Sequence, residues 1–292
     1  MSVATARMPS LSTLLRLGRI SNLPTIWTNV LAGSVIAGGS AHGDDVALIV
    51  IAMTAFYVGG MYLNDFFDRV ADARDRPGRP IDAGEIRASS VLLIGFALLA
   101  AGVVLLVPFG RSAMLCGLLL AGVIVLYDVW HKGNSLSPVV MGLCRALVYI
   151  GTGVAVTGSI PHALVIGAAA LGCHVAGITY AAKQESLDRV GNLWPLVLLA
   201  VPLLVALPAL FGGPIIIAAF VLLLAADAVA IRLLMMRPSR GAVPVAVSGL
   251  IAAICLVDAL AIAAAGGGIL LVAIAALGYP LTRLFQRSIP GT

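Results

Sequence analysis

Charged residues are scarce in this chain. Of its 292 residues, 11% are Asp, Glu, Lys or Arg and 61% are hydrophobic, which gives a mean hydropathy of +1.08. A soluble globular domain of this length needs far more charge to cover its surface, so the composition excludes that class. Cysteine is also scarce. The four cysteines fall inside apolar runs without paired spacing, and we interpret them as small packing residues.

Apolar runs of about 17 to 25 residues repeat along the whole chain, and each is long enough to cross the hydrocarbon of a bilayer. The predicted membrane-spanning helices are 22–40, 46–66, 89–109, 112–130, 138–157, 163–183, 193–211, 215–235, 244–265 and 268–285. Only the glycines at 266–268 separate the last two predicted spans. These two could form one continuous span, so the sequence predicts nine or ten spans. No linker or soluble appendage interrupts the runs, so we expect one all-α membrane domain over residues 1–292.

Two short segments beside the spans have their own patterns. Residues 7–19 place three arginines among leucines, which predicts a short amphipathic helix on the membrane surface. Asp82 to Glu85 has the pattern of a capping box ahead of the third span.

The basic residues predict the orientation of the spans. If the spans alternate in direction, almost all arginines and lysines of the loops lie on one side, and Arg111 alone lies on the other. By the positive-inside rule, the basic side is cytoplasmic. We therefore expect an integral protein of the cytoplasmic membrane. Its net charge of +5 reflects topology, and nucleic-acid binding is excluded as a function.

A cluster of acidic residues directly follows the second span. Asn64 is followed by Asp65, Asp68 and Asp72, and the aspartates fall at i, i+3 and i+7, on one stripe of a helix. Three carboxylates at the edge of hydrocarbon repel one another unless a cation lies among them. Mg²⁺, which prefers oxygen ligands, is the natural candidate.

Basic residues follow these carboxylates in the same loop. Arg74, Arg76 and Arg79 come next, and guanidinium groups of this kind suit a phosphate-bearing ligand. A membrane protein with metal-binding carboxylates and arginines at its surface is expected to handle a lipid diphosphate.

Further polar residues lie at the ends of later spans or inside them. One cluster, Tyr127 to Lys132, follows the fourth span, and another, Tyr180 to Arg189, follows the sixth. Arg145 lies within the fifth span, where a guanidinium needs a partner or a water-filled cavity. It either recognises an acceptor or makes a structural pair. Asn29 in the first span lines such a cavity or caps its helix.

Buried polar residues elsewhere have a simpler interpretation. Asp227 and Asp258 in later spans are expected to form hydrogen bonds between helices, and His174 to pack with a hydrogen bond.

These motifs resemble the UbiA superfamily of intramembrane prenyltransferases over nearly the whole chain. The residues from Asn64 to Asp72 match the family's Asn-Asp-x-x-Asp-x-x-x-Asp, and Arg76 to Ile81 matches its Arg-Pro-x-Arg-Pro-Ile. Tyr127 to Lys132 is similar to a Tyr-x-x-x-Lys element with one more residue of spacing. The resemblance implies a helical bundle around a central cavity. In it, two acidic motifs hold Mg²⁺ on a prenyl diphosphate, and the prenyl group passes to a small acceptor that is often aromatic.

The second acidic motif departs from the family pattern. Its Asp-x-x-x-Asp aligns with Gln184 to Asp188, so glutamine replaces the first aspartate, and Glu185 next to it can pair with Asp188. A single Mg²⁺ at the first motif, with Lys183 or Arg189 in place of a second cation, is the hypothesis that follows.

The resemblance and the polar residues inside the spans together predict the site residues. The expected catalytic residues are Asp65, Asp68, Asp72, Lys132 and Lys183. The expected substrate-binding residues are Asn64, Arg76, Arg79, Tyr127, Arg145, Tyr180, Arg189 and Asn29. The expected metal ligands are Asp65, Asp68, Asp72, Glu185 and Asp188.

Two other functions compete with this interpretation. A transporter or lipid carrier on the same bundle would suit the buried Arg145, Asp227 and Asp258. A non-catalytic membrane subunit would show no metal dependence. The complete first motif favours the enzyme, because a carrier has little need for so many metal-binding carboxylates.

Overall fold

The chain folds into helices. The computed structural model describes residues 9–39, 43–75, 78–183, 194–236 and 241–291, and every regular element within these ranges is helical. In order along the chain, they are α1 (Leu11–Leu17), η1 (Ile20–Asn22), α2 (Leu23–Ile36), α3 (Gly43–Asp75), α4 (Ala88–Leu106), η2 (Val107–Phe109), α5 (Arg111–Trp130), α6 (Ser137–Thr157), α7 (His162–Lys183), η3 (Trp194–Ala200), α8 (Val201–Ala206), η4 (Leu207–Gly212), α9 (Pro214–Met236), α10 (Ala242–Ala264) and α11 (Ile269–Phe285). The prediction of an all-α membrane bundle is confirmed.

Each predicted span coincides with an apolar helical segment. Within the described residues, eight segments are long and apolar enough to cross a membrane. The first and last predicted spans correspond to the shorter α2 and α11. The last two predicted spans are separate helices, because the chain turns at Gly266, whose φ of +78° favours glycine.

The seventh predicted span is irregular. Between residues 194 and 212 the chain runs as 3₁₀, α and 3₁₀ segments in succession. Pro195, Pro202 and Pro208 lie at the starts of these three pieces. Proline has no N–H to donate and its ring clashes with the preceding turn, so Pro202 and Pro208 each end the helical piece before them.

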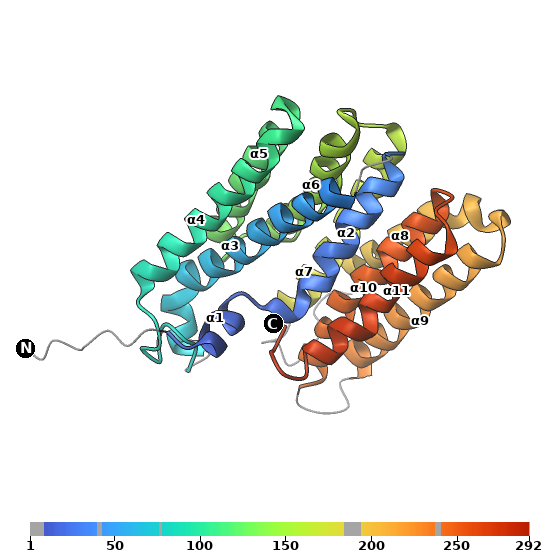
Figure 1. Cartoon of the computed structure of the whole chain (residues 1–292). Coiled ribbons are helices and arrows are strands. Elements are labelled where there is room, and N and C mark those ends of the chain that lie inside the picture. Colours follow the sequence, from blue (N-terminus) through green and yellow to red (C-terminus); the bar gives the residue numbers. More distant parts are fainter. Residues whose placement is uncertain (1–8, 40–42, 76–77, 184–193, 237–240, 292) are drawn as a thin grey trace, which may run out of the picture.

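Two groups of helices meet along α2. The helices α3, α4 and α5 lie to one side of α2 and α9, α10 and α11 to the other (Figure 1). Ile26 and Val30 of α2 pack into the core shared with α3, α5 and α6. Ala32 and Ile36 pack into the larger core shared with α7, α9 and α10. The helix α2 therefore joins the two halves.

Small residues let α6 and α7 approach closely. A Cβ added at Gly142 of α6 would collide with the backbone oxygen of Gly172 on α7. In lipid, where helices gain little from apolar contact alone, such close backbone packing holds neighbours together.

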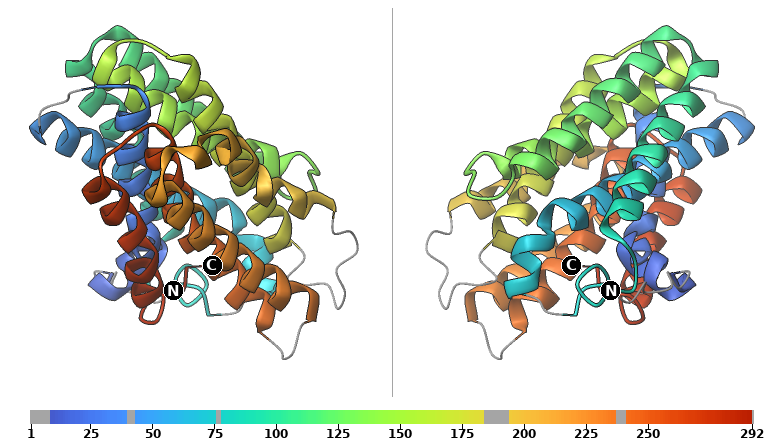
Figure 2. Two further views of the ribbon diagram at one scale, coloured as in Figure 1. Left: turned by 90° about the vertical axis from the view of Figure 1, so that its right-hand side faces the viewer. Right: turned by 90° about the vertical axis from the view of Figure 1, so that its left-hand side faces the viewer.

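A short helix is anchored beside the loop that follows α3. The predicted amphipathic helix is present as α1, and Arg16 and Thr13 both hold the carboxylate of Glu85, each at 2.5 Å. The prediction that Asp82 to Glu85 caps the third span is wrong, since Arg87 is the N-cap of α4 and makes no side-chain cap. The hydrogen bond from Thr13 and the nearby charge of Arg16 lower the pKa of Glu85. Figure 2 shows this loop, in teal, at the same end of the bundle as the C-terminal end of the chain.

Candidate active site

A cavity of about 1090 Å³ lies among α2, α3, α5, α6, α7 and α10. One end is charged, with Asp68, Asp72, Arg79, Lys132 and Lys183 in its wall. The rest is largely apolar, with a wall that includes Met53, Phe56, Ile124, Val148, Ile178 and Ile251. The cavity thus combines a charged mouth with a chamber suited to hydrocarbon.

The acidic motif presents one face of α3 to this cavity. Asn64, Asp68 and Asp72 line it, spaced four residues apart, and all are buried. Asp65 does not line it among the described residues. Its carboxylate lies 2.6 Å from Arg79 Nη1 and 3.2 Å from Arg19 Nη2. Arg79 Nη1 also lies 3.1 Å from Asp72 Oδ2, so one guanidinium bridges two of the aspartates.

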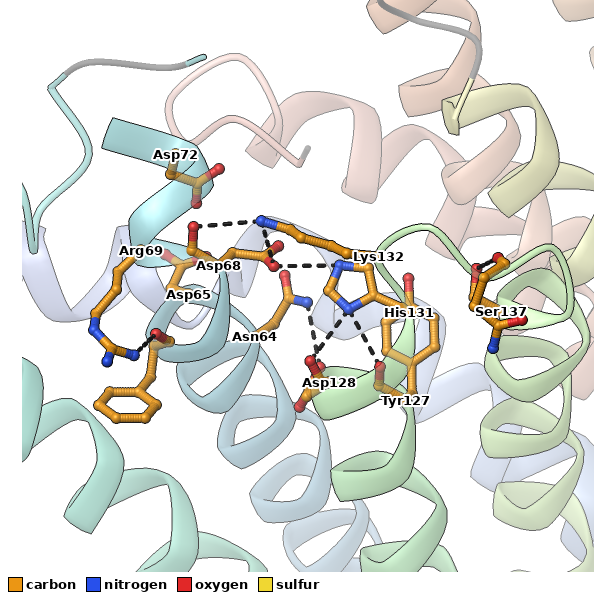
Figure 3. Close-up of polar contacts among 12 residues, drawn as sticks. Asn64, Asp65, Asp68, Arg69, Asp72, Tyr127, Asp128, His131, Lys132 and Ser137 are labelled. Atoms are coloured by element: carbon orange, nitrogen blue, oxygen red, sulfur yellow. Dashed lines mark hydrogen bonds and ion pairs between the residues drawn. The ribbon is translucent and has the colours of Figure 1, made fainter. Parts of the chain in front are cut away.

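The end of α5 supplies a second pair of cationic groups. Lys132 Nζ lies 2.7 Å from Asp68 Oδ1, and His131 Nε2 lies 3.3 Å from the same oxygen (Figure 3). Burial disfavours the charged imidazole, but the hydrogen bond and charge of Asp68 outweigh it and raise the pKa of His131. Tyr127, one helical turn earlier, stacks on the His131 ring at 4.9 Å. His131 is not among the predicted site residues, although it directly precedes Lys132.

Asp128 adds another carboxylate to the cavity wall. It is 4% exposed, and its Oδ1 accepts a hydrogen bond of 3.2 Å from Asn64 Nδ2. Its Oδ2 is buried without a hydrogen-bond partner among the described residues. Asp128 belongs to the cluster from Tyr127 to Lys132 but is not among the predicted site residues. A buried oxygen of this kind is available to a ligand.

The chemistry of these side chains fits Mg²⁺. Asn64, Asp68, Asp72 and Asp128 bring side-chain oxygens to one wall of the cavity, and oxygen is the ligand type that Mg²⁺ prefers. Within the described ranges, no three His, Cys, Asp or Glu side chains converge closely enough to hold a metal ion. Instead, Arg79 and Lys132 lie among the carboxylates and neutralise them.

Arg19 is a site residue that the sequence analysis missed. It lies just before η1 and lines the cavity, and its Nη2 donates to Asn64 Oδ1 at 3.3 Å and to Asp65 Oδ1 at 3.2 Å. It has a left-handed backbone with φ of 42°, a conformation that costs a non-glycine residue roughly 1–3 kcal/mol. The sequence predicts for Arg19 only a contribution to membrane topology, because no periodicity distinguishes it from the other arginines near the N-terminus.

Arg145 and Asn29 meet at the wall of the chamber. Arg145 of α6 lines the cavity, and its Nη1 donates to Asn29 Oδ1 on α2 at 2.8 Å. Asn29 lies behind it and is fully buried. The structure therefore brings together two predicted residues from different spans.

The other predicted residues are placed as follows. Lys183 lines the mouth, and its Nζ donates to the backbone oxygen of Asn134 at 2.5 Å. Tyr180 lies one turn earlier on α7, outside the set of described residues that line the cavity. The remaining predicted site residues lie outside the described residues: Arg76, Glu185, Asp188 and Arg189.

The two buried aspartates of the later spans differ in their hydrogen bonding. Asp258 of α10 accepts hydrogen bonds from α2 and α6, as predicted for a residue that joins helices. Asp227 of α9 lies 3.9 Å from His174 Nδ1, which is longer than a hydrogen bond, and neither of its carboxylate oxygens has a hydrogen-bond partner among the described residues. The hydrogen bond between helices that we predicted for Asp227 is therefore absent from this part of the chain. His174 Nδ1 instead lies 3.2 Å from the backbone oxygen of Leu199, so its predicted packing hydrogen bond is present.

A sequence profile of the UbiA prenyltransferase family matches residues 25–242. The chain belongs to this family. The matched region begins in α2 and ends at the first residue of α10, so it includes the acidic motif of α3 and the cluster at the end of α5. The predicted family is confirmed.

Individual UbiA proteins share the sequence or the fold with this chain. A digeranylgeranylglyceryl phosphate synthase of Methanothrix thermoacetophila is 30% identical over 122 residues, which cover 41% of this chain and 46% of that enzyme. The chain thus spans about half the length of the curated relatives that it matches.

Two solved structures share the fold. An apo UbiA homolog from Aeropyrum pernix superposes with a TM-score of 0.64 at 19% identity, covering 82% of this chain and 97% of that one. A UbiA homolog from Archaeoglobus fulgidus bound to DMAPP and Mg²⁺ gives a TM-score of 0.52 at 16% identity, covering 95% and 100%.

Proposed function

We propose that this UbiA protein transfers a prenyl group from an isoprenyl diphosphate to a small acceptor within the membrane, in a reaction that depends on Mg²⁺. The observation that carries the proposal is the arrangement of the cavity, in which carboxylates and cations surround the mouth of an apolar chamber. A prenyl diphosphate has the same division into a charged head and a hydrocarbon tail. The DMAPP and Mg²⁺ in the Archaeoglobus fulgidus structure support this assignment.

At the mouth, the charged side chains would exchange partners when the substrate enters. Asp68 and Asp72, with Asn64 and Asp128 beside them, would hold Mg²⁺. Arg79 and Lys132, which now neutralise the carboxylates, would then contact the diphosphate oxygens. When bound, Mg²⁺ supplies positive charge that stabilises the leaving diphosphate.

The transfer follows from this placement of charge. The allylic C–O bond of the substrate breaks and its electron pair leaves with the diphosphate. A bond forms between the allylic carbon and a nucleophilic atom of the acceptor, which releases a proton. Arg79 and Lys132 stabilise the negative charge that develops on the leaving group. The apolar wall around Phe56 and Ile178 excludes water, which would otherwise capture the allylic carbon.

The predicted residues outside the described ranges keep their proposed roles. We assign Glu185 and Asp188 to a second acidic site, and Arg76 and Arg189 to the diphosphate. We assign the mouth to the cytoplasmic face of the cytoplasmic membrane, and the basic loops support this assignment through the positive-inside rule. We propose a small acceptor. An aromatic compound and a glyceryl phosphate are both compatible with the names of UbiA relatives, which include a 4-hydroxybenzoate octaprenyltransferase and a digeranylgeranylglyceryl phosphate synthase.

Thermal unfolding in detergent, with geranylgeranyl diphosphate as the probe, tests this function. We expect the lipid diphosphate to raise the unfolding temperature of the wild type in the presence of Mg²⁺, and EDTA to abolish the rise. Asp68→Asn should remove the effect, whereas Asp82→Asn, at an exposed loop position, should retain it. Absence of stabilisation in the wild type, with or without Mg²⁺, would contradict both the enzyme and a prenyl carrier.

Product analysis separates the enzyme from the other candidates. Mass spectrometry of lipids and small aromatics from cells with and without the protein should reveal a product heavier by one prenyl group. A carrier would bind the diphosphate without forming such a product, and a non-catalytic subunit would do neither.

A further inference from the structure

Arg145 is a cation in the cavity wall with no anionic partner among the described residues. Arg145 is the ninth residue of α6, so it lies about 12 Å along the helix axis from Ser137 at the start of the helix. At the mouth, Arg79 and Lys132 each contact an aspartate. Arg145 makes no such ion pair within the described chain, although a charge inside a membrane protein is expensive unless it serves a ligand or a partner.

The hydrogen bonds of Arg145 go to neutral groups and fix its position. Nη1 donates to Asn29 Oδ1 at 2.8 Å and Nη2 donates to Thr25 Oγ1 at 3.1 Å. The guanidinium also lies 5.6 Å from the centre of the Tyr57 ring. These contacts use two of the five N–H donors of an arginine, so donors remain for a molecule in the cavity.

A buried carboxylate behind the wall orients this arrangement. Asp258 is fully buried and accepts from Asn29 Nδ2 at 2.8 and 2.9 Å, from Thr28 Oγ1 at 2.5 Å and from Tyr149 OH at 2.6 Å. Because Asn29 gives its N–H₂ group to Asp258, its carbonyl oxygen faces Arg145. Asn29 therefore separates the two charges, and the guanidinium remains directed at the cavity rather than paired to Asp258.

The mouth of the cavity and the part of its wall around Arg145 are therefore expected to bind different anions. A diphosphate that binds together with Mg²⁺ belongs at the mouth, where the carboxylates are. A prenyl tail would leave the charge of Arg145 without water and without a counter-ion, so the tail belongs elsewhere in the chamber. Of the two substrates, the acceptor is therefore the one that remains as a ligand for Arg145.

We infer that Arg145 binds an anionic group of the acceptor, a carboxylate or a phosphate, and that Asn29 and Asp258 position it for this role. This inference rests on the proposed function and names the class of its second substrate. A planar guanidinium with free donors matches the oxygens of either group.

Binding to the full-length protein, with geranylgeranyl diphosphate and Mg²⁺ present, tests the inference with two pairs of probes. One pair is 4-hydroxybenzoate and its neutral amide. The other is geranylgeranylglyceryl phosphate and its dephosphorylated form. We expect the wild type to bind the anionic member of at least one pair at least tenfold more tightly, and the responding pair identifies the source of the anion.

Three variants link the preference to the side chain. Arg145→Gln should bind the anionic and the neutral member of the responding pair with affinities within twofold of each other. Arg145→Lys should restore part of the preference for the anionic member. Arg111→Gln, at an exposed position on the opposite side of the membrane by the predicted topology, should leave it unchanged. All three should bind geranylgeranyl diphosphate within twofold of the wild type.

The contradicting results are distinct. If the wild type binds geranylgeranyl diphosphate but prefers the anion in neither pair, or if the preference survives in Arg145→Gln, the inference is overturned and the proposed function stands. If Arg145→Gln does not fold, the wild-type ratios and Arg145→Lys decide. If the wild type does not bind geranylgeranyl diphosphate, the proposed function fails first.

Discussion

Lys132 Nζ lies 2.7 Å from Asp68 Oδ1, and this contact joins the end of α5 to the acidic face of α3. If a diphosphate binds here together with Mg²⁺, the metal ion would replace Lys132 as the cation beside Asp68. The diphosphate would replace Asp68 as the anion beside Lys132. The pair is therefore placed to change partners without leaving either charge unpaired.

Replacing Lys132 with methionine should lower kcat/KM for prenyl transfer on the order of 10²-fold. The reason is that a preorganised cation next to the leaving group acts mainly in the transition state. Steady-state kinetics with a saturating acceptor measure the change. Arg87→Met, at an exposed position ahead of α4, is the matched control and should retain the wild-type rate. Equal rates in Lys132→Met and wild type would remove Lys132 from the catalytic assignment.

The docking of α1 should weaken in acid through Glu85. Its pKa is lowered by Thr13 and Arg16, so its contribution to stability is present above the ordinary pKa of about 4.5 and is lost as the pH falls through the lowered value. Unfolding temperatures of wild type and Glu85→Gln should therefore differ at pH 7 and converge as the pH falls through the lowered pKa. A constant difference across this range would assign the effect of the substitution to something other than charge.

Removing one donor from Asp258 should destabilise the protein. Tyr149→Phe deletes the hydroxyl that lies 2.6 Å from Asp258 Oδ1. Loss of a hydrogen bond to a buried carboxylate lowers the free energy of unfolding by about 1–3 kcal/mol. Reversible unfolding in mixed micelles measures the loss. Tyr279→Phe, at a half-buried position of α11, controls for removal of a tyrosine hydroxyl. If both variants lose the same stability, the contact with Asp258 contributes nothing specific.

The sequence predicted the helices well because length and apolarity alone decide whether a segment can cross hydrocarbon. The sequence predicted less well which side chains line the cavity together. The spacing of Asp65, Asp68 and Asp72 placed them on one stripe, yet Asn64 faces the cavity with Asp68 and Asp72, while Asp65 pairs with two arginines beside it. The rotation of α3 about its axis depends on how it packs against its neighbours, and one sequence does not encode this locally.

The partners of buried polar residues were also beyond the sequence. Nothing in the spacing of Asn29, Tyr149 and Asp258 indicates that they meet, because they come from three helices that only the tertiary fold brings together. The irregular stretch from 194 to 212 is a different case. Its three prolines were visible, and they mark where the helix is interrupted.

The close approach of α6 and α7 gives the sharpest packing prediction. Because a Cβ at Gly142 would collide with the backbone oxygen of Gly172, Gly142→Ala must push the helices apart, and overpacking of this kind costs about 1–3 kcal/mol. Gly122→Ala on α5 is the matched control, since a Cβ there meets nothing within 4 Å; the alanine should be neutral or slightly stabilising in a helix. Unfolding temperatures of the two variants should therefore move apart. Since α6 also carries Arg145, the displacement in Gly142→Ala should weaken acceptor binding more than diphosphate binding. Equal stability of the two variants would show that the backbones of α6 and α7 are not in the contact described.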